Sequence, residues 1–212
     1  MDKKKEKDEV LNDEDINKKQ KKILKNFLIV SGTIIIAVVV FFIFSRYNES
    51  FVYNGVNFSV VKFCDSGPFS CLITYNTKVP VIYKGKNSNY NFYLRNDPRK
   101  LGRDIPFEGD LILTEKMFVK ITFNQYCQGD EKIAVENFLN LHRVIGINVS
   151  SGEKSVCDIT GTNTFILIQE SNTTKIEKIG PSCYNINIKN CEIIKGMERF
   201  MIETFVKINQ IN

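Results

Sequence analysis

Residues 27–44 read FLIVSGTIIIAVVVFFIF, eighteen residues without an ionisable side chain. As a helix rising about 1.5 Å per residue, this stretch is about 27 Å long, close to the ~30 Å hydrocarbon thickness of a bilayer. Lysines precede it, and Arg46 and Tyr47 follow it, which is typical of a membrane span and not of a buried core helix. The sequence therefore predicts a transmembrane helix over residues 27–46.

A cleaved signal peptide is the main alternative to this anchor. Signal peptides have a shorter apolar region of about 7–15 residues, which ends at a cleavage site with small residues. Here the apolar stretch is longer and runs into Ser45, Arg46 and Tyr47 without that pattern of small residues. We therefore expect the helix to stay attached to the chain.

The segment before the span, residues 1–26, has nine lysines, seven acidic residues and almost no apolar side chains. It cannot bury enough apolar surface to fold, so we predict that it is disordered. Basic residues next to a span favour its cytoplasmic side and also attract anionic lipid headgroups. We therefore expect a single-pass protein of the cell membrane with a cytoplasmic N-terminus and an extracytoplasmic C-terminal domain. The lysines nearest the span are Lys18, Lys19, Lys21, Lys22 and Lys25.

All the cysteines follow the span, which indicates an oxidising compartment and three disulfides. They are Cys64, Cys71, Cys127, Cys157, Cys183 and Cys191. Six cysteines allow about 15 pairings, so the sequence leaves the connectivity open. Pairing of nearest neighbours would join Cys64 to Cys71, Cys127 to Cys157, and Cys183 to Cys191. Four glycosylation sequons, at Asn48, Asn57, Asn148 and Asn172, agree with an exported domain.

Other uses of the cysteines are less well supported by their spacing. A zinc site or a thioredoxin-like redox pair would call for C-x-x-C, which the chain lacks. Cys127 and His142 could be imagined as a nucleophile and its base. His142 has polar neighbours on a predicted helix, however, so we expect a surface histidine and a disulfide-bonded Cys127. The sequence assigns no catalytic residue, cofactor or metal site.

The outer region carries 19 basic and 17 acidic residues, so it gives no reason to expect a nucleic-acid surface.

Residues 47–125 are predicted to be β-rich. Asn54 and Gly55 lie between apolar runs, the strongest short signal of a hairpin. Strands are expected over 56–63, 71–76, 79–84, 89–95 and 116–124, and Asn96, Asp97 and Pro98 should end the fourth of them.

Residues 126–212 change to a mixed pattern. Apolar residues recur at helical spacing within 131–145 and 192–208, whereas 164–169 and 184–188 read as strands. With the strand before them, the predicted order is β-α-β-β-β-α, and the pattern marks residues for two of the three strands between the helices. We therefore predict an α+β protein: a transmembrane helix, a β-rich unit, and a sandwich unit in which two helices pack against one sheet.

The densest polar cluster is the loop around residues 94–100. Its basic side chains, Arg95, Arg99 and Lys100, could bind an anionic partner. The alternative is a turn in which Asp97 caps the backbone while the basic residues are solvated, and this alternative is the more frequent one.

Several motifs resemble a group of uncharacterised, single-pass membrane-anchored proteins of small-genome archaea of the Woesearchaeota type. Residues 90–101 read YNFYLRNDPRKL, and the others are 183–184 (CY), 191–193 (CEI) and 198–200 (ERF). The resemblance covers most of the outer region. It implies an archaeal cell-surface setting and no particular activity.

The leading hypothesis is therefore a non-enzymatic binding or assembly module, held at the lipid bilayer and meeting a protein partner at the cell surface. A membrane-tethered, thiol-dependent enzyme is the second hypothesis, and it needs a free cysteine. A third is a subunit of a larger membrane complex, because Ser31, Gly32 and Thr33 are small residues of the kind found where helices pack closely in membranes.

Overall fold

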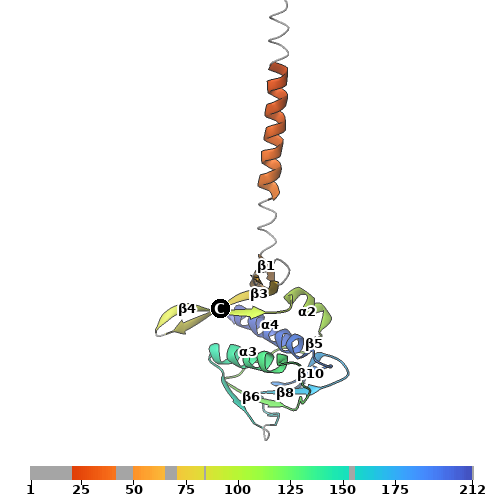
Figure 1. The fold of residues 1–212 in the computed structure, drawn as a ribbon. Helices are drawn as coiled ribbons and strands as arrows, with labels where there is room; N and C mark the ends of the chain where they lie inside the picture. Colours follow the sequence, from red (N-terminus) through yellow and green to blue (C-terminus); the bar gives the residue numbers. More distant parts are fainter. Residues whose placement is uncertain (1–20, 42–49, 65–70, 84, 153–155, 212) are drawn as a thin grey trace, which may run out of the picture. The chain divides into compact units, whose positions relative to one another are not determined.

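The computed structural model describes residues 21–41, 50–64, 71–83, 85–152 and 156–211 (Figure 1). The predicted disorder of residues 1–20, the flanking residues Arg46 and Tyr47, and the sequon at Asn48 lie outside this range. The chain divides into two units, residues 1–49 and residues 50–212.

The described residues of the first unit form a helix, Lys21–Phe41, which is long and apolar enough to cross a membrane. It begins six residues before the predicted span. Two of its polar side chains bond within the helix: Ser31 Oγ donates to the Leu28 carbonyl at 3.1 Å, and Thr33 Oγ1 donates to the Ile29 carbonyl at 2.7 Å. The predicted apolar helix is confirmed, and its place in a membrane stays a prediction.

The second unit begins with an antiparallel sheet of four strands in chain order. The strands are β1 (Ser50–Tyr53), β2 (Val56–Cys64), β3 (Cys71–Tyr83) and β4 (Lys86–Leu94). Asn54 and Gly55 have φ angles of 47° and 85°, so the predicted β1–β2 hairpin is confirmed. The break expected between residues 76 and 79 is wrong, because Thr77 and Lys78 stay paired with β4 in one long strand.

A second sheet has six strands in the order β5-β9-β10-β8-β6-β7. Neighbours are parallel from β7 through β6 and β8 to β10, whereas β9 runs antiparallel to β10. The strands are β5 (Phe107–Glu108), β6 (Lys116–Ile121), β7 (Asn148–Ser151), β8 (Thr164–Glu170), β9 (Lys175–Gly180) and β10 (Cys183–Ile188).

This second sheet corrects two expectations. Strand β6 was expected in the β-rich part but pairs with β7 and β8, so the boundary at residue 125 does not separate the two sheets. Strands β5, β7 and β9 were not predicted as such. They are short or mostly polar at the surface, and Ile176 is the only side chain of β9 that is fully buried. Strands β5 and β7 are the edges of the sheet, and β9 pairs on both sides; strands this short or this polar have no strong period-two pattern.

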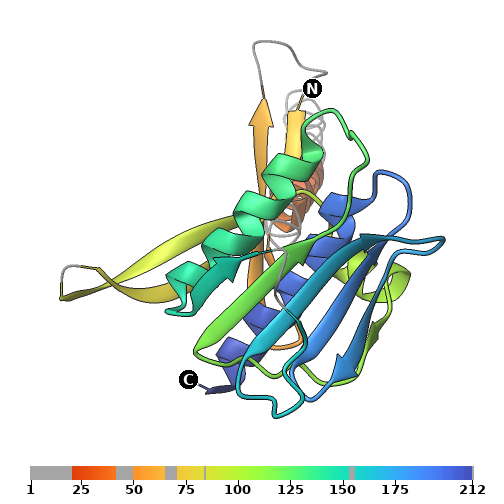
Figure 2. The same cartoon turned by 90° about the horizontal axis from the view of Figure 1, so that it is seen from below.

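Three helices complete the unit: α2 (Pro98–Asp104), α3 (Asp130–Val144) and α4 (Ile193–Ile211). Helices α3 and α4 pack against each other and cover one face of the six-stranded sheet (Figure 2). Helix α4 also contacts β2 of the other sheet. The unit is therefore α+β, as predicted, with α4 lying between the two sheets.

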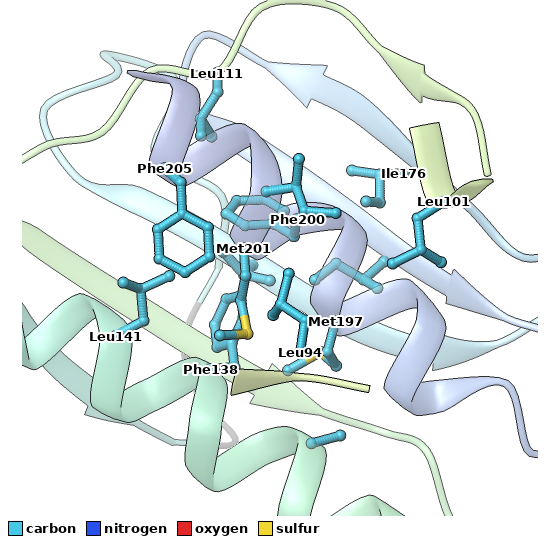
Figure 3. Close-up of a cluster of buried hydrophobic side chains, with 14 of the residues drawn as sticks. Leu94, Leu101, Leu111, Phe138, Leu141, Ile176, Met197, Phe200, Met201 and Phe205 are labelled. Atoms are coloured by element: carbon cyan, nitrogen blue, oxygen red, sulfur yellow. The ribbon is translucent and has the colours of Figure 1, made fainter. Parts of the chain in front are cut away.

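Aromatic side chains of α4 join the two sheets into one core (Figure 3). The Phe200 ring lies 5.4 Å from that of Phe138 on α3 and 5.6 Å from that of Tyr184 on β10. On another side of the helix, the Phe205 ring lies 5.7 Å from Phe92 and 6.5 Å from Phe58, both in the four-stranded sheet. Such ring pairs add to the free energy gained by burial alone.

All six cysteines form disulfides, which join Cys64 to Cys71, Cys127 to Cys191, and Cys157 to Cys183. The first pair is the nearest-neighbour pair, and the other two nearest-neighbour pairs are wrong. Strand β10 begins at Cys183 and runs away from it, so eight residues of chain separate Cys183 from Cys191 by up to about 26 Å. A disulfide needs Cα atoms within about 7 Å. Strand β10 thus places Cys191 beyond its far end, where Cys127 lies.

We expect the same connectivity in the purified protein. Proteolysis without reduction should yield cross-linked peptides that contain Cys127 with Cys191 and Cys157 with Cys183. By loop-closure entropy, replacing the Cys127–Cys191 pair with serines should lower the free energy of unfolding by about 4 kcal/mol, against about 2.5 kcal/mol for the Cys64–Cys71 pair. A peptide that joins Cys183 to Cys191 would contradict the fold described here.

Candidate functional site

The structure uses the two arginines of the predicted binding loop within the domain itself. Arg95 pairs with Asp130 of α3 at 3.1 Å. The Arg99 guanidinium pairs with Asp97 at 2.7 Å and lies 3.9 Å from the centre of the Phe51 ring. Lys100, the third residue, is exposed and lines a cleft. Of the three basic residues of the predicted binding loop, Lys100 is therefore the one that is available to a ligand in the cleft.

The predicted capping role of Asp97 is confirmed. Asp97 is the N-cap of α2, and its Oδ1 accepts a hydrogen bond from the Arg99 backbone N–H at 2.9 Å. Pro98 follows at the start of the helix, where its missing N–H costs nothing. Burial opposes ionisation of Asp97, but hydrogen bonds and the charge of Arg99 outweigh it and lower the pKa of this carboxyl. The carboxylate thus fixes both α2 and Arg99.

The cleft beside α2 has a volume of about 730 Å³. Its walls come from α2, from the turn between β8 and β9, and from the chain between β10 and the first turn of α4. These segments are far apart in the sequence, so the fold alone assembles the cleft. Its charged lining residues are Lys100, Lys175, Lys189, Lys195, Asp97, Asp104 and Glu192.

One hydroxyl group holds two walls of the cleft together. Thr174 Oγ1 donates to Glu192 Oε2 at 2.6 Å and accepts from the Lys189 backbone N–H at 3.0 Å. The hydroxyl therefore connects the β8–β9 turn to the segment that leads into α4. Hydrogen bonds from Lys195 and from Thr174 lower the pKa of Glu192, so this carboxyl is ionised at neutral pH.

Most charges of the cleft are paired. Lys195 contacts Glu192 at 2.8 Å, Lys175 contacts Glu177, and Asp97 is held by Arg99. Within the described part of the chain, Lys100, Lys189 and Asp104 take part in no ion pair. Lys100 lowers the pKa of Asp97 and Lys189 lowers that of Glu192 through their charges, but neither lysine is held in an ion pair with a described residue. Both side chains are exposed at the cleft, where the backbone N–H groups at the start of α4 add partial positive charge. An anionic group is the ligand chemistry that fits this arrangement.

Glu198 of α4 holds the connection between β4 and α2, which contributes residues to the lining of the cleft. It accepts hydrogen bonds from the backbone N–H groups of Arg95 at 2.5 Å and Asn96 at 3.0 Å, and from the Asn96 side chain at 2.8 Å. Burial raises the pKa of Glu198 to about 7, although these hydrogen bonds favour the ionised form. Sequence reasoning missed this residue. An acidic residue within the apolar stripe of a predicted helix is the signal that could have pointed to it.

Arg199, the next residue, is also buried. Its Nε donates to the Ile105 carbonyl at 3.0 Å, its NH1 pairs with Glu203, and its guanidinium lies 5.5 Å from the centre of the Phe107 ring. These contacts tie the chain after α2 to α4. All of them lie within the domain, so we assign Arg199 a structural role.

The expected surface position of His142 is wrong. The side chain is fully buried, with Nδ1 2.8 Å from the Phe138 carbonyl oxygen and Nε2 3.4 Å from Thr204 Oγ1. Residue 142 lies one turn after Phe138, on the buried face of α3, and its polar sequence neighbours point elsewhere. Burial lowers the pKa of His142 to about 4. Because Cys127 is disulfide-bonded, the two residues form no nucleophile–base pair.

His142 and Glu198 make the free energy of unfolding depend on pH in opposite directions. Glu198 binds its proton more tightly when folded, so its contribution falls as the pH rises from about 4.5 to 7. His142 binds its proton less tightly when folded, so its contribution rises between about pH 4 and 6.5. At ~1.4 kcal/mol per pKa unit, each effect is about 3 kcal/mol, and the two partly cancel.

Glutamine substitutions should separate the two effects in urea unfolding of the full chain in detergent. Glu198→Gln leaves the histidine effect, so the free energy of unfolding should rise from pH 4 to 6.5. His142→Gln leaves the glutamate effect, so it should fall from pH 4.5 to 7. The slope is the readout, because either variant also changes the stability at every pH. Equal slopes in both variants would contradict the burial of these groups.

Among the described residues, no group of three or more His, Cys, Asp or Glu side chains could hold a metal ion. Comparison with protein-family models, curated proteins and solved structures gives no match. The resemblance to archaeal membrane-anchored proteins therefore stays a prediction.

Proposed function

We propose that this protein is a membrane-anchored, extracytoplasmic binding module whose cleft takes a ligand with a phosphate or carboxylate group. The observation that carries this proposal is the pair Lys100 and Lys189, two lysines without an ion pair in the described structure, on the walls of a cleft of about 730 Å³. A volume of this size suits a small molecule or the end of a polymer.

The proposed placement draws on the apolar helix and the disulfides. Helix Lys21–Phe41 has the length of a span, and three disulfides are stable in an oxidising compartment. Lysines precede the span, which supports a cytoplasmic N-terminus. Together these features favour a domain held on the outer side of the cell membrane.

Binding is favoured over thiol chemistry. The alternative enzyme needs an unpaired cysteine as nucleophile, and all six cysteines are disulfide-bonded. The buried ionisable residues Glu198, Arg199 and His142 are bonded within the core and face no cleft of comparable size. The polar groups that line the cleft are mainly lysines, threonines and carboxylates, which suit recognition of a charged polar ligand.

The topology can be tested with alkaline phosphatase fused after Asn212, because this enzyme is active only outside the bacterial cytoplasm. We expect an active fusion at the membrane. Changing Lys18, Lys19, Lys21, Lys22 and Lys25 to glutamine should lower its activity, since these lysines hold the N-terminus inside. The control changes Lys3, Lys4, Lys5 and Lys7, which lie farther from the span and should matter less. An inactive fusion, or a mature chain that starts near Tyr47, would overturn the proposed anchor.

The cleft can be tested by calorimetry of the full chain in detergent, with tripolyphosphate as the probe. We expect binding that weakens with salt. The double variant Lys100→Ala/Lys189→Ala should bind about tenfold more weakly, since each partly exposed ion contact contributes up to ~1 kcal/mol.

The matched control removes two exposed lysines elsewhere, Lys116→Ala/Lys132→Ala, with the same change in net charge. It should leave the affinity within about twofold, because its effect is screened over distance. Equal losses in both double variants would show binding to net charge alone and would contradict a site in the cleft.

A further inference from the structure

The outward face of the four-stranded sheet carries an exposed apolar patch at the end of the β2–β3 hairpin. Side chains alternate along a strand, so Phe58 and Phe92 point to α4 while Phe63, Leu72 and Tyr93 point away. Phe63 and Leu72 are each 50% exposed and Tyr93 is 43% exposed. Phe63 pairs with Leu72 across the hairpin, and its ring lies 5.6 Å from that of Tyr93. We call these three residues the hairpin patch.

The strand register places this patch on the side from which the chain enters the domain. Ser50, the first residue of β1, pairs with Ser59, and β2 continues for five residues beyond that point, to Cys64. At about 3.3 Å per residue, the hairpin extends about 16 Å past the start of β1. Figure 2 shows β2 and β3, in orange and yellow, projecting from the rest of the domain. The Cys64–Cys71 disulfide closes their end.

The connection to the apolar helix limits how far this sheet can lie from a membrane. Eight residues separate Phe41 from Ser50, and even fully extended they span at most about 32 Å. The chain enters the domain through β1, in the same sheet as the hairpin patch. If the helix spans a bilayer, the four-stranded sheet is therefore within reach of its surface.

We propose that the hairpin patch lies in the interfacial region of the bilayer and orients the domain there. A phenyl ring, a leucine and a tyrosine suit this region, where tyrosine places its apolar ring among lipid and its hydroxyl in water. The inference rests on the proposed anchor and does not depend on the ligand of the cleft.

The absence of tryptophan from the sequence allows a direct test. Single tryptophans are introduced into the full chain, which is reconstituted in phosphatidylcholine vesicles with or without brominated acyl chains. Leu72→Trp reports on the hairpin patch, Val38→Trp on the apolar helix, and Ile179→Trp on β9, where residue 179 is as exposed as residue 72. We expect brominated lipid to quench the tryptophan at residue 72 at least about threefold and to leave that at residue 179 within about 20%, since only groups within the bilayer meet the acyl chains.

The possible outcomes test the membrane contact of the hairpin separately from the membrane anchor. Quenching at residue 38 without quenching at residue 72 would overturn the membrane contact of the hairpin and leave the anchor standing. Failure to quench at residue 38 would overturn the anchor, and the inference with it. A blue-shifted emission at residue 72 that bromine does not quench would show a second copy of the domain on the patch and would also overturn the proposal.

Adding Phe63→Ser to the Leu72→Trp chain provides a second measurement. It removes a half-exposed ring and should reduce the quenching at residue 72, because less apolar surface then favours the interface. The same substitution should leave the urea midpoint of unfolding nearly unchanged, since Phe63 is outside the core. Equal quenching with and without Phe63 would contradict a role of the patch in holding the domain at the bilayer.

Discussion

The position of α4 between two sheets is the constraint on which the rest of the domain depends. Most side chains from Ile193 to Val206 are buried, because opposite faces of the helix meet different sheets. Phe200 packs against α3 and the six-stranded sheet, and Phe205 packs against the four-stranded sheet. Neither sheet could bury its inner face without this helix, so two sheets formed by different parts of the chain share one core.

Buried polar contacts then fix the connections between the layers. Glu198 holds the backbone of Arg95 and Asn96, and Arg199 holds the carbonyl of Ile105. These contacts tie both ends of α2 to α4. The lysine-lined cleft lies where α2, the β8–β9 turn and the start of α4 meet, so its shape follows from the same helix. Buried groups of this kind are costly when unpaired, and here each finds a partner.

The surface of the domain carries two features of different chemical character, the cleft and the hairpin patch. The cleft beside α2 carries two lysines that form no ion pair in the described structure, whereas the hairpin patch is apolar and partly aromatic. The two features lie on different parts of the domain, one assembled by the six-stranded sheet and α2, the other at the end of the β2–β3 hairpin.

Local patterns in the sequence predicted the elements whose signals are local. The apolar helix, the Asn54–Gly55 hairpin, the cap at Asp97, and helices α3 and α4 follow from composition, turn chemistry and periodicity over a few residues. Short strands such as β7 and β9 carry too little apolar alternation to be recognised. The tertiary structure alone decided that Cys127 pairs with Cys191, that His142 is buried and that Lys100 and Lys189 line the same cleft. Each of these depends on which segments the strand order brings together, and the free energy of packing that selects this order is not contained in any single segment of the chain.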